Sequence, residues 1–327
     1  MKKRALGASG IEVAEIGLGC MGMSEFYGPS DEAESLATLR RAVELGVDFF
    51  DTADMYGIGH NERLLSALAS SHPGVKIATK FGIVRELGKY ERRIDNSPDY
   101  IVKACDASLQ RLGIDYIDLY YAHRIDGSVP IEDMVGAMAG LVKAGKIKAI
   151  GLCEVSAKTL RRAHAVHPIA AVQSEMSLWT RDMEAEVLPA CQELGVAFVA
   201  YSPLGRGMLT GAIAQDTEFA AGDFRNIAPR FTAEYRAANL RLVELLKALA
   251  AEKACSPSQL ALAWLLRRAE NIIPIPGTRK IARLEENIAA ADIVLTPADV
   301  ARLEAALPAG AAAGDRYPAA GQVGLNA

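Results

Sequence analysis

Short runs of β-branched and aromatic residues alternate along the chain with longer segments in which apolar residues recur every three or four positions. Several of the runs are almost continuously apolar, which is typical of parallel strands covered on both faces. The pattern predicts eight strands, over residues 13–19, 47–53, 76–81, 115–123, 147–153, 170–175, 196–203 and 271–277.

The segments between these runs have the pattern of amphipathic helices. In 31–45, for example, Leu36, Leu39 and Val43 fall on one helical face. Helix starts are indicated where an N-cap residue precedes proline, at Ser97-Pro98, Ser256-Pro257 and Thr296-Pro297. Further helices are expected over 62–71, 97–112, 131–144, 156–166, 183–194, 232–252, 258–268, 280–291 and 297–306.

Eight strand-then-helix units predict a (β/α)8 barrel of the α/β class, formed by one domain over 1–327. Residues 1–12 are expected to lead into it through a short hairpin around Ala8-Ser9-Gly10. The stretch 204–231 breaks the regular pattern and is expected to be a long loop over the barrel mouth, after the seventh strand. Extra helices follow at the C-terminal end, and the Ala/Gly-rich tail 308–327 is expected to be loosely ordered.

A doubly wound dinucleotide-binding sheet is the competing fold. Residues 17–22 read GLGCMG and meet the G-x-G-x-x-G spacing, and Asp51 would be its acidic partner. Seven further strand–helix units would crowd such a sheet, so the barrel is favoured.

Composition and charge remove several classes of protein. The 36 Lys+Arg against 40 Asp+Glu give a net charge of −4, and 50% of the residues are hydrophobic, so the chain is neither disordered nor a nucleic-acid binder. No apolar stretch approaches the roughly 20 residues needed to span a bilayer, and Glu12 and Glu15 interrupt any signal-like segment. Five scattered cysteines favour a reducing compartment, so a cytoplasmic protein with no membrane contact is expected.

Polar residues occur where the predicted strands end, which is where barrels of this kind place their function. Asp51 and then Tyr56 follow the second strand, Lys80 ends the third, and His123 with Arg124 ends the fourth. Later strands contribute Gln173 and Glu175, Tyr201 and Ser202, and the run from Gly277 to Lys280.

A carboxylate, a phenol, an ammonium and an imidazole at adjacent strand ends suit carbonyl reduction. Lys80 can stabilise the phenolate of Tyr56, and Asp51 can hold Lys80. His123 can donate a hydrogen bond to a carbonyl oxygen while Tyr56 protonates it. The hydride must come from a cofactor, because no side chain supplies one.

At these residues the chain resembles the aldo-keto reductases, over essentially its full length and most closely their bacterial and plant branch. The matching strings are FFDTADMYG (49–57), NERLL (61–65), ATKFG (78–82), DLYYAHRID (118–126), AVQSE (171–175), YSPLGRGMLTG (201–211) and IPGTRKIARLEEN (275–287). The resemblance implies a (β/α)8 barrel that reduces aldehydes and ketones with NADPH and uses no metal. Its catalytic tetrad would be Asp51, Tyr56, Lys80 and His123.

The resemblance also implies where the cofactor binds. Cys20 and Met21 would lie on the nicotinamide-ribose side, with Gln173 on the carboxamide and Tyr201 stacked on the ring. Asp51 would also contact the cofactor. Ser202, Pro203, Leu204, Arg206, Gly207 and Leu209 would embrace the pyrophosphate. Gly277, Thr278, Arg279, Arg283, Glu286 and Asn287 would hold the adenosine end. Cations at 279, 280 and 283, where a helix is expected to begin, also suit a 2′-phosphate on chemical grounds.

Two positions depart from the family pattern. After the fifth strand the resemblance implies that Cys153 and Glu154 contact the cofactor. Relatives usually have Ser followed by Asn or Glu at these positions, and a thiol is a weak donor for the carboxamide. Met176 stands where Tyr is common, and it is expected to change the pocket wall. Among other aromatic and polar residues, Trp179 is expected to line the pocket, Trp264 to lie in the core, and His60 to lie near the mouth.

Two other functions compete with a reductase that acts on small-molecule carbonyls. One is a cofactor-bound sensor or accessory subunit on the same barrel, with little turnover. The other is a metal-dependent hydrolase, which needs several His, Asp or Glu ligands at strand ends, where only His123 qualifies. Substrate choice is expected to depend on the loops 21–30, 83–96, 124–130 and 204–231.

Overall fold

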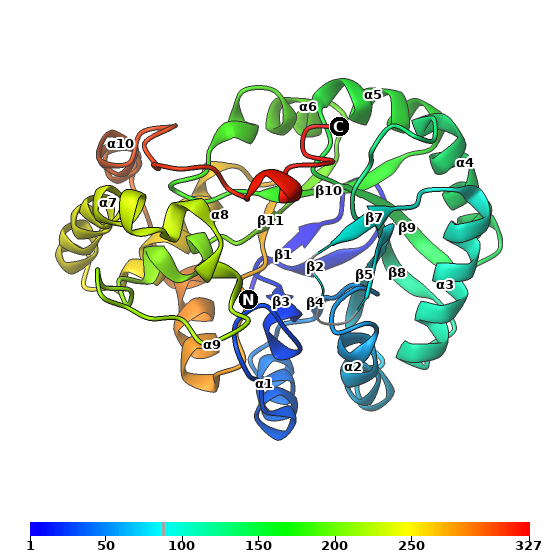
Figure 1. Cartoon of the computed structure of the whole chain (residues 1–327), viewed down its shortest axis with the longest axis horizontal. Coiled ribbons are helices and arrows are strands. Elements are labelled where there is room, and N and C mark those ends of the chain that lie inside the picture. Colours follow the sequence, from blue (N-terminus) through cyan, green and yellow to red (C-terminus); the bar gives the residue numbers. More distant parts are fainter. Residues whose placement is uncertain (87–88, 90) are drawn as a thin grey trace.

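The computed structural model describes residues 1–86, 89 and 91–327, and it has the predicted barrel (Figure 1). Eight parallel strands form one sheet in chain order, and each later strand pairs with the one before it. A bridge between Gly19 and Gly277 joins the first strand to the end of the last, and the amide of Gly17 donates to the carbonyl of Pro274 at 3.0 Å. The strands are β3 (Leu18–Gly19), β4 (Phe49–Asp51), β5 (Lys76–Phe81), β8 (Ile117–Ala122), β9 (Ile147–Cys153), β10 (Ile169–Glu175), β11 (Ala197–Tyr201) and β12 (Ile272–Pro274).

Helices surround this sheet, as Figure 1 shows. The predicted starts at Ser256-Pro257 and Thr296-Pro297 are confirmed, because both side chains accept from the backbone three residues on and complete a capping box. The helices are α1 (Glu32–Glu44), α2 (His60–Ser71), α3 (Pro98–Leu112), α4 (Ile131–Lys143), α5 (Ala157–Val166), α6 (Val187–Glu193), α7 (Ala233–Glu252), α8 (Pro257–Arg268), α9 (Ile281–Ile288) and α10 (Pro297–Ala306). Within the described ranges, no helix is both long and apolar enough to cross a membrane.

The predicted first strand, 13–19, divides into two elements with different roles. Its beginning belongs to β2 (Glu12–Ala14), which pairs antiparallel with β1 (Lys3–Ala5) in the expected hairpin. Leu6 and Val13 are fully buried and pack with the inward-facing side chains of the barrel strands. The hairpin therefore closes one end of the barrel, and the site must form at the other.

A second hairpin was not expected. β6 (Ile83–Arg85) pairs antiparallel with β7 (Arg92–Ile94) inside 83–96, which the sequence indicated only as a pocket loop. It directly follows β5, so it rises from the strand that carries Lys80.

The tail beyond residue 307 makes specific contacts with the barrel. Figure 1 shows it, coloured red, crossing the open side of the barrel. The amide of Ser156 donates to the carbonyl of Ala327 at 2.9 Å, and Tyr317 is only 9% exposed. An ion pair between Arg316 and Glu154 also holds the segment down. These polar contacts attach the tail to the barrel despite its Ala/Gly-rich composition.

Candidate active site

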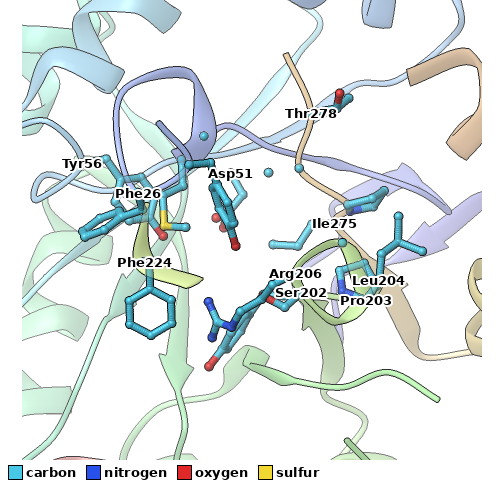
Figure 2. Close-up of a pocket in the computed structure, with 18 of the residues that line it drawn as sticks. Phe26, Asp51, Tyr56, Ser202, Pro203, Leu204, Arg206, Phe224, Ile275 and Thr278 are labelled. Atoms are coloured by element: carbon cyan, nitrogen blue, oxygen red, sulfur yellow. The ribbon is translucent and has the colours of Figure 1, made fainter. Parts of the chain in front are cut away.

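A pocket of about 630 Å³ opens at the carboxyl ends of the barrel strands. Figure 2 shows Phe26, Tyr56 and Phe224 at one end and Thr278 and Leu204 at the other. Loops after β3, β4, β11 and β12 supply most of the wall, as expected for a barrel whose opposite end is closed by a hairpin.

Three members of the predicted tetrad meet around one buried ammonium. Lys80 is fully buried, forms an ion pair with Asp51 and donates to the carbonyl of Thr52 at 2.8 Å. Its Nζ lies 3.4 Å from the hydroxyl of Tyr56. Burial lowers the pKa of Lys80, but Asp51, Tyr56 and Cys153 together outweigh burial and raise that pKa above its ordinary value, so the ammonium stays charged.

The pKa of Tyr56 differs from the sequence-based expectation. Burial of the phenol raises its pKa above the ordinary value, and the opposing effect of Lys80 is the smaller of the two. In this structure Tyr56 is therefore a protonated phenol that holds its proton beside an ammonium. A proton acceptor that becomes strongly basic during a reaction could remove that proton, because Lys80 is placed to stabilise the phenolate left behind.

His123 completes the group from the end of β8. Its ring lies edge-on to Tyr56, with centroids 5.8 Å apart and planes at 84°. Burial, followed by the nearby cations Lys80, Arg124 and Arg92, lowers the pKa of His123 well below its ordinary value. The imidazole is therefore neutral, and its N–H can donate a hydrogen bond although the ring carries no positive charge.

Asp51 is held from a second side by Gln173, whose Nε2 donates to Oδ2 at 2.7 Å. Cys153 lines the same region, and burial raises the pKa of its thiol to about 12. The departure from the family pattern at residue 153 thus places a small, un-ionised side chain beside the tetrad.

Most residues expected at the cofactor line this pocket, whereas three do not. The lining set comprises Met21, Asp51, Cys153, Gln173, Tyr201, Ser202, Pro203, Leu204, Arg206, Gly207, Gly277, Thr278, Arg279, Arg283, Glu286 and Asn287. Cys20 and Leu209 are instead buried in the core, where their apolar character places them. The third exception is Glu154.

Glu154 is fully buried and belongs to a polar network beneath the tail. Its Oε1 accepts from the Tyr201 hydroxyl at 2.7 Å, and its carboxylate forms the ion pair with Arg316. The Tyr201 hydroxyl also lies 2.8 Å from that of Tyr317. Although burial favours the protonated acid, Arg316 and Arg124 lower the pKa of Glu154, so it carries a charge. The sequence did not indicate a role for Arg316 and Tyr317 in this network. The tail around them is Ala/Gly-rich like a linker, and only their charge and aromatic ring distinguish it from one.

Three further expectations concern single side chains. Trp179 does not line the pocket: it is 3% exposed and packs beneath Gly205, because the loop after β11 covers it. Trp264 is buried in the core as expected, with its Nε1 3.1 Å from Glu304. Glu175 is a structural acceptor that pairs with Arg206.

The far end of the pocket has the chemistry of a phosphate site. Arg279 and Arg283 line it where α9 begins, and Arg283 has no carboxylate partner within the part of the chain that the structure describes. Arg279 is positioned by donating to the carbonyls of Gly22 and Tyr27, both at 3.1 Å. Two guanidiniums and a helix N-terminus together suit a phosphate monoester, so the residues present fit the adenosine end of a phosphorylated dinucleotide.

No group of three or more His, Cys, Asp or Glu side chains is arranged to hold a metal ion among the described residues.

Comparison with known proteins gives a consistent result. The model of the Aldo/keto reductase family matches residues 15–308. A probable aldo-keto reductase 1 from Glycine max is 45% identical over 315 residues, which cover 95% of this chain and 90% of the relative. The structure of glycerol dehydrogenase from Gluconobacter oxydans has a TM-score of 0.85 at 27% identity, covering 93% of this chain and 94% of that one. The holo form of an aldo-keto reductase from Bacillus halodurans has a TM-score of 0.78 at 27% identity, covering 95% and 97%.

Proposed function

The chain belongs to the aldo/keto reductase family of oxidoreductases, and from its site we propose that it reduces aldehydes or ketones to alcohols with NADPH, with Tyr56 as the general acid. The observation that carries this proposal is the contact of the Tyr56 hydroxyl with the fully buried, charged Lys80. A phenol so placed can give up its proton only when a stronger base forms beside it.

Each tetrad residue has a separate task in this proposal. A nicotinamide cofactor bound in this pocket would supply the hydride that the carbonyl carbon requires. Tyr56 gives its hydroxyl proton to the carbonyl oxygen, and Lys80 stabilises the phenolate that remains. His123, as a neutral imidazole, donates a hydrogen bond to that oxygen and orients the substrate. Asp51 keeps Lys80 charged and in place.

The preference for NADPH over NADH rests on the guanidiniums at the far end of the pocket. Arg279 and Arg283 lie beside the start of α9, where a 2′-phosphate can accept charge-assisted hydrogen bonds. NADH has a hydroxyl there, which would leave both cations without an anion.

Fluorescence titration with NADPH and with NADH tests this choice. The Arg283→Leu variant is expected to raise the Kd for NADPH by about tenfold and to leave that for NADH within about twofold. Arg302→Gln is the matched control, because Arg302 lies on the outer helix α10 in an exposed pair with Glu252. Equal affinity of the wild-type protein for both nucleotides would contradict the assignment. Tight NADPH binding with no turnover on any carbonyl would favour a sensor or accessory role.

A further inference from the structure

The end of the pocket beside Tyr56 and His123 is rich in cations. Arg124 follows His123 at the end of β8, and Arg92 comes from the β6–β7 hairpin. Both line the pocket, and after burial and Lys80 both contribute to the lowered pKa of His123. Arg85 and Lys89 line it as well.

Arg85 and Lys89 both have carboxylate partners. Arg85 forms an ion pair with Glu25, and Lys89 pairs with Glu86 at 2.6 Å. Their charges are balanced within the protein, so they add little net attraction for an anion.

Arg124 is in a different position. It is 5% exposed, and among the residues that the structure describes its Nη1 donates only to the carbonyl of its neighbour His123, at 2.8 Å. Its buried Nε has no hydrogen-bond partner among the described residues. The Glu154 carboxylate also interacts electrostatically with Arg124, but it already pairs with Arg316 and accepts from Tyr201. A buried guanidinium with an unused donor is costly unless a ligand completes its hydrogen bonds.

The tail keeps this cation away from water. A Cβ at Gly324 would lie 3.3 Å from Cδ of Arg124, so the tail is in contact with that side chain. Arg92 donates to the carbonyl of Gly321 at 3.2 Å in the same segment. Electrostatic attraction is stronger in such a covered region than at an open surface.

We propose that Arg124, assisted by Arg92, binds an anionic oxygen group on the substrate, so that the preferred substrates are carbonyl compounds carrying a carboxylate or a phosphate a few bonds from the reacting carbon. This inference rests on the proposed reductase function. Arg124 would then be a specificity-determining residue: it holds the end of the substrate opposite the carbonyl that Tyr56 and His123 contact.

The test compares three aldehydes of one shape: 4-carboxybenzaldehyde, its uncharged methyl ester, and 4-formylphenyl phosphate. The wild-type protein is expected to have a kcat/KM for at least one charged aldehyde about tenfold or more above that of the ester, mainly through a lower KM. Whichever charged aldehyde is favoured identifies the anionic group.

Variants assign the preference to the two arginines. Arg124→Met is expected to reduce the ratio of kcat/KM between charged aldehyde and ester by about tenfold. Arg92→Met is expected to reduce the same ratio by a smaller factor. This second variant still tests the inference if Arg124→Met folds poorly. Arg162→Gln on α5 removes one exposed cation that pairs with Glu132, and it should leave the ratio unchanged. Equal efficiency on charged and uncharged aldehydes in the wild-type protein, or an unchanged ratio in both methionine variants, would overturn the inference while leaving the reductase proposal intact. Failure to reduce any of the three aldehydes would overturn both.

Discussion

Gln173 donates to Oδ2 of Asp51 at 2.7 Å, and Lys80 takes the other carboxylate oxygen. A side chain expected to bind the cofactor's carboxamide is thus tied directly to the charged pair beneath Tyr56. The two halves of the site, one for binding and one for proton transfer, share a single carboxylate.

Replacing Gln173 with leucine should therefore affect both halves. Loss of one hydrogen bond to a buried carboxylate is expected to lower the free energy of unfolding by about 2 kcal/mol. The Kd for NADPH should rise as well. Urea unfolding and fluorescence titration measure the two effects separately. An unchanged stability would show that the contact with Asp51 contributes nothing.

The loop after β11 depends on a glycine that packs against a ring. Gly205 has a φ of +57°, and a Cβ there would lie 2.6 Å from Nε1 of Trp179. Gly205→Ala is expected to lower the free energy of unfolding by about 3 kcal/mol, from backbone strain and overpacking together. Gly222→Ala is the control, since Gly222 has a φ of +78° with open space around it. In this variant backbone strain alone should lower the free energy of unfolding of the protein, by about 1 kcal/mol. Equal effects of the two variants would contradict the packing part of this account.

The tail should loosen when its buried anion is neutralised. Glu154→Gln keeps the shape of the side chain but leaves Arg316 without a counter-ion, so a loss of about 3 kcal/mol in the free energy of unfolding is expected. Glu285→Gln removes one partner of the exposed pair with Arg41, and it should change stability far less than Glu154→Gln does. Urea unfolding of both variants would show a similar small effect if Glu154 had no structural role.

His123 should make the protein less stable in mild acid. Its pKa is lowered in the folded state, so below about 6.5 the unfolded chain binds a proton that the folded protein does not. Stability should then fall with decreasing pH, by up to about 1.4 kcal/mol per pH unit, until the folded pKa is reached. His123→Gln removes this contribution, so unfolding curves at pH values above and below 6.5 should show a shallower dependence for the variant. Parallel pH dependences would show that the imidazole titrates normally.

The barrel and the place of the tetrad could be predicted because they depend on local patterns. Apolar runs mark the strands, and Lys80 at the end of such a run requires a carboxylate, which Asp51 provides at the neighbouring strand end. The hairpin holding Arg92 and the attached tail holding Tyr317 could not be predicted in the same way. The hairpin lies in a highly charged stretch, and the tail is rich in Ala and Gly. Neither segment therefore has the periodic pattern of apolar residues from which a strand or helix is predicted.

The sequence also could not show which cation pairs with Glu154. Glu154 was expected at the cofactor, but it faces Arg316, which lies far along the chain. A motif places such a residue at a strand end and cannot tell which of several distant cations will reach it. Trp179 was misplaced for a related reason, because the loop that buries it has no regular pattern.

The most direct test of the proposed reaction is the loss of nicotinamide absorbance when NADPH and 4-nitrobenzaldehyde are mixed with the wild-type protein and with Tyr56→Phe. The wild-type protein should oxidise NADPH as the aldehyde is consumed. The variant should bind NADPH with a similar Kd but turn over at least about 100-fold more slowly, because only the proton donor is missing. Turnover by the variant at the wild-type rate would contradict the assignment of Tyr56 as the general acid.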